Sequence, residues 1–144
     1  TYNEGVDITD LSQYPANHFD IISFKSVLGA LSTKKKQQIA INEMNRILKP
    51  NGAILFAENM QGSFLHFFFR RIFIRWNSYW RYLNLNSDLD LFSESKTLKL
   101  GTFGFLATFG RTEKQKTLLH HFDKIAKPLI PKSWRYVLCG VLIK

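Results

Sequence analysis

The sequence is poor in cysteine and in acidic residues, and both shortages exclude classes of protein. Its 144 residues include one cysteine, Cys139, so an internal disulfide framework and a cysteine-rich zinc site are excluded. Aspartate and glutamate number 11 against 20 lysines and arginines, which gives a formal net charge of +9. This balance favours anionic partners such as phosphates, acidic lipids or nucleic acid, without choosing among them.

The sequence also lacks a long apolar run and a recognisable leader. No stretch approaches the roughly 18 consecutive apolar residues that span a bilayer. The first ten residues, TYNEGVDITD, are polar and acidic, unlike a basic leader followed by an apolar core. They also start without methionine, so we expect a processed, trimmed or partial chain. Hydrophobic residues make up 45% and charged residues 22%, which indicates one globular domain.

Hydrophobic periodicity predicts strands that alternate with helices. Short apolar runs predict buried strands over residues 19–24 and 53–57 and in the final segment RYVLCGVLIK, where Cys139 is expected to be a buried thiol. Helical spacing predicts a helix over residues 33–48 with Ser32 as its N-cap. This order indicates an α/β protein whose sheet is mostly parallel with a reversed last strand, flanked by helices.

Glycine, proline and polar clusters predict the connections. Pro50 and Gly52 are expected to stop the helix in a tight turn before the second strand. Residues 84–100 are expected to form a polar loop, and KIAKPLIPKSW is expected to hold a strand followed by a proline-rich connection. A late helix is expected over residues 113–122. Its expected inward side chains are Leu118, Leu119 and Phe122.

Three segments resemble one known family. VDITDL, FDIISFKSVLGAL and EMNRILKPNGAILFAEN follow the order and spacing of class I S-adenosylmethionine-dependent methyltransferase domains. In that family the third segment contains Leu-Lys-Pro-Gly-Gly, where this sequence has LKPNG. Asn51 replaces the first of these glycines, and asparagine also tolerates left-handed backbone. The resemblance is strongest over residues 6–59, and residues 120–144 are similar to the family's closing helix and strand hairpin. It implies a Rossmann-like fold and S-adenosylmethionine as cofactor.

The resemblance also implies parts that these residues lack. The family's first strand ends in a glycine-rich loop beside the cofactor, and its second strand ends in an acidic residue that holds the ribose hydroxyls. Neither has a counterpart here, since Gly101, Gly104 and Gly110 lack the strand-to-helix context and are interpreted as turns. We therefore expect the C-terminal part of the domain over residues 1–144, with weak cofactor binding and an exposed edge on the FDIISF strand that favours self-association.

The resemblance assigns four residues to the cofactor. Asp7 would accept a hydrogen bond from the adenine amino group, with the backbone of Ile8 beside it. Phe24 and Lys25 follow the FDIIS run and would line the cofactor pocket. A turn or cap role is the structural alternative for Asp7. No metal-ligand spacing is present.

Two residues are candidates for catalysis. Glu58, with Asn59, follows the second strand, near where a methyl acceptor would lie. His66 comes a few residues later and is the best candidate for a general base. The structural alternatives are a polar loop cap for Glu58 and an ordinary helix histidine for His66. Methyl transfer depends on proximity and orientation, and a base is needed only if the acceptor must lose a proton.

Residues 63–83, SFLHFFFRRIFIRWNSYWRYL, form an aromatic and basic insertion. As one helix it would carry an apolar face, with its arginines off that face. Three interpretations stay open: a helix covering the sheet with solvated arginines, a lid over the acceptor site, or a segment in a membrane interface with arginines on lipid phosphates. The apolar face would comprise Leu65, Phe69, Ile72, Phe73, Trp76, Tyr79, Trp80 and Leu83, and the arginines are Arg70, Arg71, Arg75 and Arg81.

These observations predict S-adenosylmethionine-dependent methyl transfer to a small or lipid-linked acceptor. The acceptor class extends to sugars, because FLHFFFRRIF followed by WRYL resembles family members from bacterial surface-glycan clusters. The alternative is a catalytically inactive remnant or a membrane-interface binding module. We expect a cytoplasmic protein, with peripheral contact at the inner membrane face through residues 64–83 as an open alternative. Nucleic acid is the disfavoured partner, since the insertion is too apolar for a wet groove.

Overall fold

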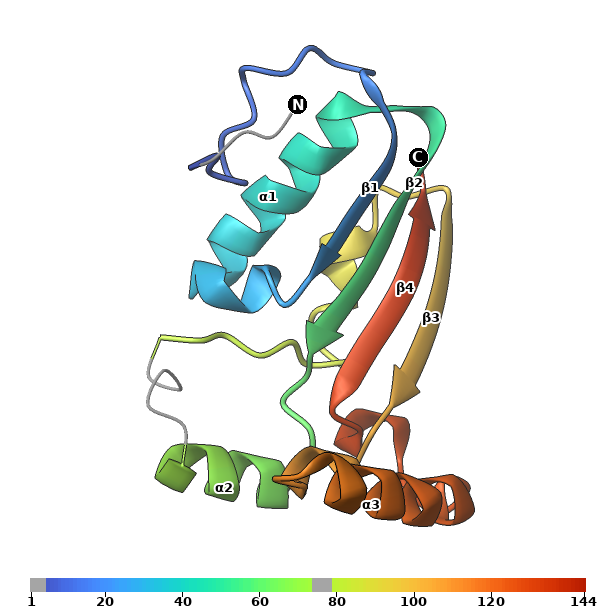
Figure 1. Cartoon of the computed structure of the whole chain (residues 1–144). Helices are drawn as coiled ribbons and strands as arrows, with labels where there is room; N and C mark the ends of the chain where they lie inside the picture. The colour runs from blue at the N-terminus through green and yellow to red at the C-terminus, as the bar shows by residue number, and fades with distance from the viewer. Residues whose placement is uncertain (1–4, 74–78) are drawn as a thin grey trace.

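The computed structural model describes residues 5–73 and 79–144, which form a four-stranded sheet with three α-helices and short 3-10 turns (Figure 1). The strands lie in the order β1-β2-β4-β3. The strands are β1 (Phe19–Lys25), β2 (Leu48–Asn59), β3 (Thr97–Phe103) and β4 (Val137–Ile143); the helices are α1 (Lys34–Ile47), α2 (Phe64–Phe73) and α3 (Glu113–Ala126); the 3-10 turns are η1 (Leu28–Leu31), η3 (Leu89–Phe92), η4 (Ala107–Phe109) and η5 (Lys132–Trp134).

Three strands run in one direction and the last strand is reversed. β1 and β2 pair in parallel, whereas β4 pairs antiparallel with both β2 and β3. β3 therefore runs in the same direction as β1 and β2, as the arrowheads in Figure 1 show. This arrangement confirms the predicted fold class, including the reversed final strand.

The core lies between α1 and one face of the sheet. Ile54 and Phe56 of β2 are buried on this face, against the inner side of α1, which buries Ile41 and Met44. The ring of Phe56 stacks on Phe92 of η3 at a centroid separation of 5.0 Å. Helix α1 begins one residue later than expected: Thr33, not Ser32, is the N-cap, and its side chain accepts a hydrogen bond from the backbone N of Lys36 (3.3 Å).

The Pro50-Asn51-Gly52 segment is part of β2, so the predicted turn is wrong in its boundaries. Leu48 pairs with Phe19 and Ala53 pairs with Ile21, which gives a register shift across this segment. Asn51 adopts a left-handed φ of 63°, as its place in the glycine turn of the family pattern suggested. A Cβ on Gly52 would lie 2.9 Å from the backbone oxygen of Asp20, so the bulge requires glycine.

The opposite face of the sheet is largely uncovered by the described residues. Ile21 is 62% exposed and lies on this face beside Ala53, and Leu55 is exposed on the same face. β1 is an edge strand, as expected for the FDIISF run. Self-association through this edge stays a prediction.

The insertion differs from its predicted continuous helix. Helix α2 ends at Phe73, and Tyr79 and Trp80 are not helical, while Leu83 forms an isolated bridge with Met60. Arg75 and Trp76 lie outside the described residues. Arg81 is not simply solvated, because its guanidinium donates to Gln37 and to Asp88 and thereby ties this segment to α1.

The face that α2 buries against the protein differs from the predicted one. His66 and Arg70 are its buried side chains, whereas its predicted inward residues are exposed. Both polar side chains find hydrogen-bond partners within the protein, which avoids the cost of leaving a buried polar group unpaired. The exposed apolar side chains of α2 are Phe64, Leu65, Phe67, Phe68, Phe69, Ile72 and Phe73.

Three predictions for the C-terminal half are corrected. Residues 84–100 are not wholly a loop, since η3 buries Leu91 and Phe92 and β3 begins at Thr97. KIAKPLIPKSW holds the end of α3 and the turn η5 instead of a strand, because its two prolines cannot donate to a ladder. In α3 the predicted inward residues Leu118 and Phe122 are exposed, and Leu119 is half-buried. Cys139 lies in β4 as predicted, half-buried.

Candidate functional site

The carboxyl ends of β1, β2 and β3 meet at one edge of the sheet, the lower edge in Figure 1. Helices α2 and α3 lie along this edge. Ligands of open α/β sheets bind outside the carboxyl ends of the strands. Glu58 and Asn59, the last residues of β2, and His66, which follows this strand, are therefore at the edge where a site is expected.

An apolar cleft of about 350 Å³ is lined by β1, by α1 and by the segment that precedes β1. Ile8 and Phe24, two of the predicted cofactor contacts, both line it. Asp7 is exposed next to Ile8, and its Oδ1 accepts hydrogen bonds from the backbone N and the hydroxyl of Thr9 (2.9 and 2.8 Å). The bond from the Thr9 amide is the main cause that lowers the pKa of Asp7, so this carboxylate is charged at neutral pH.

Lys25 does not line this cleft. Successive strand residues alternate between faces, so Lys25 lies on the face of β1 opposite to Phe24, where it is exposed. Phe24 also stacks on Phe56 with ring centroids 5.8 Å apart. The ring of Phe24 therefore belongs both to the core and to the wall of the cleft.

Glu58 is fully buried and holds the backbone that follows β1. Its Oε1 accepts hydrogen bonds from the amides of Val27 (2.5 Å) and Leu28 (2.9 Å), while its buried Oε2 has no partner among the described residues. Burial raises the pKa of Glu58, and the amide of Leu28 only partly offsets this. Asn59 acts on the same segment, since its Nδ2 donates to the hydroxyl of Ser26 (3.3 Å).

His66 is 2% exposed and uses both ring nitrogens internally. The backbone N–H of Ser63 donates to Nδ1 (3.2 Å), so Nδ1 is the acceptor and the proton of the neutral ring is on Nε2. Nε2 then donates to the carbonyl oxygen of Phe105 (3.0 Å). Burial lowers the pKa of His66, which keeps the ring neutral. His66 thus joins the start of α2 to the segment after β3.

Arg70 is buried, although the sequence analysis placed it off the inward apolar face of the insertion. It is 4% exposed, and its guanidinium lies 3.8 Å from the ring centroid of Tyr82 and 4.8 Å from that of Tyr136. Nη1 donates to the carbonyl of Gln61 (2.9 Å) and Nη2 to that of Met60 (2.7 Å). The signal in the sequence was a polar pair, His66 and Arg70, four residues apart in a helix whose other side chains, except that of Arg71, are apolar.

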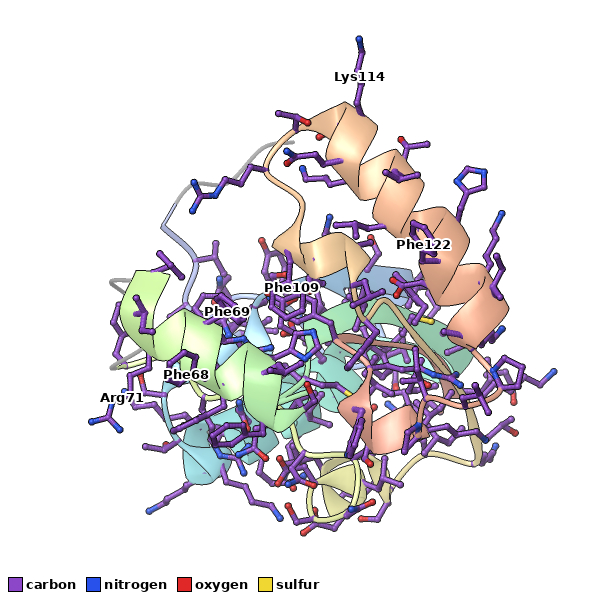
Figure 2. All side chains as sticks on the ribbon, turned by 90° about the horizontal axis from the view of Figure 1, so that it is seen from below. Phe68, Phe69, Arg71, Phe109, Lys114 and Phe122 are labelled. Carbon is purple, nitrogen blue, oxygen red and sulfur yellow. The ribbon has the colours of Figure 1, made fainter. Side chains whose placement is uncertain are left out.

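A second cleft, of about 470 Å³, lies between α2 and the segment that joins β3 to α3. The ring of Phe69 packs on that of Phe109, with centroids 5.1 Å apart (Figure 2). The guanidinium of Arg111 lies 5.9 Å from the ring centroid of Phe73. The lining contains two arginines and no acidic side chain: His66, Phe69, Arg70, Phe73, Thr108, Phe109, Gly110, Arg111 and Tyr136.

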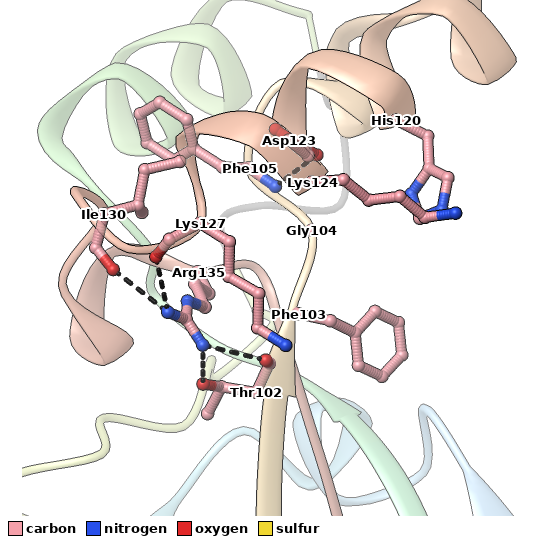
Figure 3. Close-up of a pocket in the computed structure, with 10 residues that line it drawn as sticks. All are labelled: Thr102, Phe103, Gly104, Phe105, His120, Asp123, Lys124, Lys127, Ile130 and Arg135. Carbon is pink, nitrogen blue, oxygen red and sulfur yellow. Dashed lines mark hydrogen bonds between the residues drawn. The ribbon is translucent and has the colours of Figure 1, made fainter.

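A smaller cavity of about 190 Å³ lies between the end of β3 and α3 (Figure 3). Its polar groups bind the protein itself. The carboxylate of Asp123 accepts hydrogen bonds from the amides of Phe105, Leu106 and Ala107 (2.7–3.1 Å). The guanidinium of Arg135 donates to backbone oxygens of Thr102, Lys127 and Ile130. These bonds attach α3 and the β3–α3 segment to the sheet. The Asp123 and Arg135 side chains of this cavity therefore have a structural role.

Residues 5–73 and 79–144 contain neither a group of metal-ligating side chains nor a helix that could cross a membrane. No three histidine, cysteine, aspartate or glutamate side chains of these residues are grouped as metal ligands. Among the same residues, no helix has both the length and the apolar character needed to cross a membrane.

Comparison with known proteins identifies the fold. Residues 4–56 match the family model described as "Methyltransferase domain". Similar solved structures include a SAM dependent methyltransferase from Archaeoglobus fulgidus, with 8% identity and a TM-score of 0.63 over 96% of this chain and 66% of that one. Another from Methanosarcina mazei shares 13% identity, with a TM-score of 0.60 over 96% of this chain and 65% of that one.

A third similar structure contains ligands. Phosphoethanolamine N-methyltransferase 2 of Haemonchus contortus, in complex with phosphomonomethylethanolamine and S-adenosylhomocysteine, shares 12% identity, with a TM-score of 0.56 over 91% of this chain and 35% of that one. The chain thus spans about two thirds of the length of the two archaeal proteins and about a third of this one. A comparison with curated protein sequences found no match.

The internal bonds of His66 predict how stability depends on pH. Because its pKa is lowered in the folded chain, the unfolded chain takes up a proton at about pH 6.5 while the folded ring stays neutral. The free energy of unfolding should therefore fall as pH decreases below about 6.5. Denaturant titrations from about pH 8 to about pH 5 should show this slope, and His66→Gln should remove it.

His120→Gln is the matched control, since His120 is an exposed histidine on α3. It should retain the wild-type slope. An unchanged slope in His66→Gln would contradict the neutral, internally bonded state assigned to this ring.

Proposed function

We propose that this chain takes part in methyl transfer from S-adenosylmethionine to a small or lipid-linked acceptor. The proposal starts from its fold, which is that of the S-adenosylmethionine-dependent methyltransferases. The observation that carries this proposal is the coincidence of two features. The segment that matches the methyltransferase domain, residues 4–56, includes the apolar cleft beside Asp7. A second cleft lies near the carboxyl ends of β2 and β3. We assign the first cleft to the cofactor and the second to the acceptor.

The first cleft fits the adenine part of the cofactor. Ile8 and Phe24 give it an apolar wall, which suits a flat heterocycle. The charged carboxylate of Asp7 beside it would accept a hydrogen bond from the exocyclic amino group. Lys25 is not among the residues that line this cleft, so we assign it no contact there.

The residues of this chain supply one wall of the cofactor site. The glycine-rich loop and the acidic ribose-binding residue of the resemblance have no counterpart in the 144 residues. We propose that further protein, next to the edge of β1, completes the site. The uncovered sheet face with Ile21 and the unpaired edge of β1 support this proposal, because a doubly wound sheet is covered on both faces.

Bound S-adenosylmethionine supplies an already activated methyl group, so the protein mainly has to hold and orient the acceptor. Glu58 and His66 serve this purpose in our proposal. Glu58 fixes the amides of Val27 and Leu28 after β1, and His66 fixes the start of α2 above the second cleft. Both are positioning residues, since the acceptor nitrogen of His66 is already occupied by Ser63.

The exposed surface of α2 and α3 supports a second, compatible proposal, contact with a membrane. Phe64 is 76% exposed and Ile125 is 78% exposed. Figure 2 shows Phe68 of α2 and Phe122 of α3 on this lower side of the molecule, with Arg71 near Phe68 and with Lys114 projecting from the start of α3. Aromatic and basic side chains together favour an anionic lipid interface. Arg70 takes no part in such contact, because it is buried.

Nuclear magnetic resonance locates the cofactor site even if binding is weak. Titration of S-adenosylhomocysteine into the ¹⁵N-labelled chain should shift the amides of residues 7–9 and 24–27. Asp7→Asn should weaken this response about tenfold, because a charged acceptor is lost. Asp10→Asn is the matched control, since Asp10 caps the amide of Ser12 in the same manner (3.1 Å). Absence of shifts at both segments would contradict the proposed function.

Vesicle flotation tests the membrane contact. The chain should float with vesicles of phosphatidylcholine and phosphatidylglycerol, and the double variant Phe64→Ser, Phe68→Ser should lose at least about tenfold in bound fraction, because two exposed rings no longer insert. Phe103→Ser, which removes an exposed ring from the sheet, should float like wild type. If the wild-type chain stays with the unbound fraction, the membrane proposal fails.

A further inference from the structure

Arg70 carries a buried positive charge for which the described residues provide no acidic partner. The two hydrogen bonds of its guanidinium go to neutral carbonyl oxygens, those of Met60 and Gln61. The rings of Tyr82 and Tyr136 lie against the guanidinium. Its Nε is buried and has no hydrogen-bond partner. Burial also lowers the pKa of Arg70. A buried cation without a counter-ion is unfavourable, which makes Arg70 a candidate for binding an anion.

The lining of the cleft beside Arg70 carries positive charge and no negative charge. Arg70 and Arg111 both line it, and no aspartate or glutamate does. Two other polar side chains of its lining are already bonded within the protein: Nε2 of His66 and the hydroxyl of Thr108 both bind the carbonyl of Phe105. The two guanidinium groups and the hydroxyl of Tyr136 are therefore the side-chain donors available to a ligand.

The rest of the cleft is apolar. Phe69, Phe73 and Phe109 line it, with their rings packed on one another. Its volume of about 470 Å³ lies within the range of small-molecule sites. Phosphate and carboxylate oxygens suit the arginine fork, and the aromatic wall suits a carbon skeleton attached to that group.

The bonds of Arg70 also relate the cleft to the sheet. Met60 and Gln61 directly follow β2, whose carboxyl end carries Glu58 and Asn59. An anion held by Arg70 would thus be anchored next to the carboxyl end of β2.

We propose that the cleft between α2 and the β3–α3 segment binds a phosphate or carboxylate group of the methyl acceptor, with Arg70 as the buried donor and Arg111 as the donor at the rim. This inference rests on the proposed function for the identity of the ligand as the acceptor. It names the substrate class, which is an anionic molecule with an apolar part.

The Nε–H resonance of Arg70 is the direct reporter. Inorganic phosphate and acetate, titrated separately into the ¹⁵N-labelled chain, should shift this resonance, because Nε is the unpaired donor. The Nε–H of Arg46 is the matched internal control, since it already donates to Glu43 (3.0 Å) and should not move. A larger shift with phosphate assigns a phosphate group, and a larger shift with acetate assigns a carboxylate.

Arg111→Gln tests the rim without disturbing buried contacts, because Arg111 is exposed. It should weaken the phosphate response by roughly three- to tenfold while leaving the S-adenosylhomocysteine shifts at residues 7–9 unchanged. Vesicles that contain phosphatidic acid form a further arm. A shift at Arg70 with these vesicles that exceeds the shift with inorganic phosphate identifies a lipid headgroup as the source of the anion.

The outcomes separate the two proposals. An unmoved Arg70 resonance with phosphate, acetate and the vesicles overturns the anion site, and it leaves the proposed function standing if S-adenosylhomocysteine still shifts residues 7–9. A phosphate shift at Arg70 without any S-adenosylhomocysteine shift supports the anion site and overturns the proposed function. Equal shifts at Arg70 and Arg46 overturn the inference, since they show general binding to guanidinium groups.

Discussion

The burial of one polar pair, His66 and Arg70, sets how α2 lies on the rest of the chain. These side chains are four residues apart and share one side of the helix, so both can bind the protein only if that side faces inward. His66 bonds to the segment after β3 and Arg70 to the backbone after β2. Phe64, Phe67 and Phe68 then face outward, whereas Phe69 and Phe73 line the cleft beside Arg70. The arginine-lined cleft and the exposed phenylalanine surface are both consequences of this one orientation.

Two unlike clefts adjoin the sheet, one beside β1 and α1 and the other near the carboxyl ends of β2 and β3. Parallel pairing of β1 and β2 places Ser26 and Asn59 next to each other, and Glu58 fixes the backbone of Val27 and Leu28 behind them. The first cleft, beside Ile8, is apolar with a charged carboxylate at its border, and the second has two arginines in an aromatic wall. The carboxylate would favour a methyl donor whose heterocycle carries an amino group in the first cleft. The arginines would favour an anionic acceptor in the second cleft.

Much of the sheet, but little of the second cleft, followed from the sequence. The runs FDIISF and AILFA predicted β1 and the main part of β2 because their burial is set by short apolar stretches. The resemblance to the methyltransferases depended on residues 6–59, where local pattern and tertiary contacts agree. In α2 they disagree: a hydrophobic wheel takes apolar side chains to be inward, and it cannot register long-range partners such as Phe105 for His66 or Tyr136 for Arg70. The same limit explains why Leu118 and Phe122 are exposed, contrary to the prediction. Helix α3 is attached to the β3–α3 segment through the carboxylate of Asp123 instead.

The central claim is that this chain supplies the acceptor side of a methyltransferase and only one wall of its cofactor site. Calorimetric titration of S-adenosylmethionine into the 144-residue chain tests it most directly. We predict weak binding, with a dissociation constant on the order of a millimolar or more. The chain offers the cofactor one carboxylate and one apolar wall, without the glycine-rich loop and the acidic ribose-binding residue. Micromolar binding by the chain alone would contradict it, since the residues present would then form a complete cofactor site.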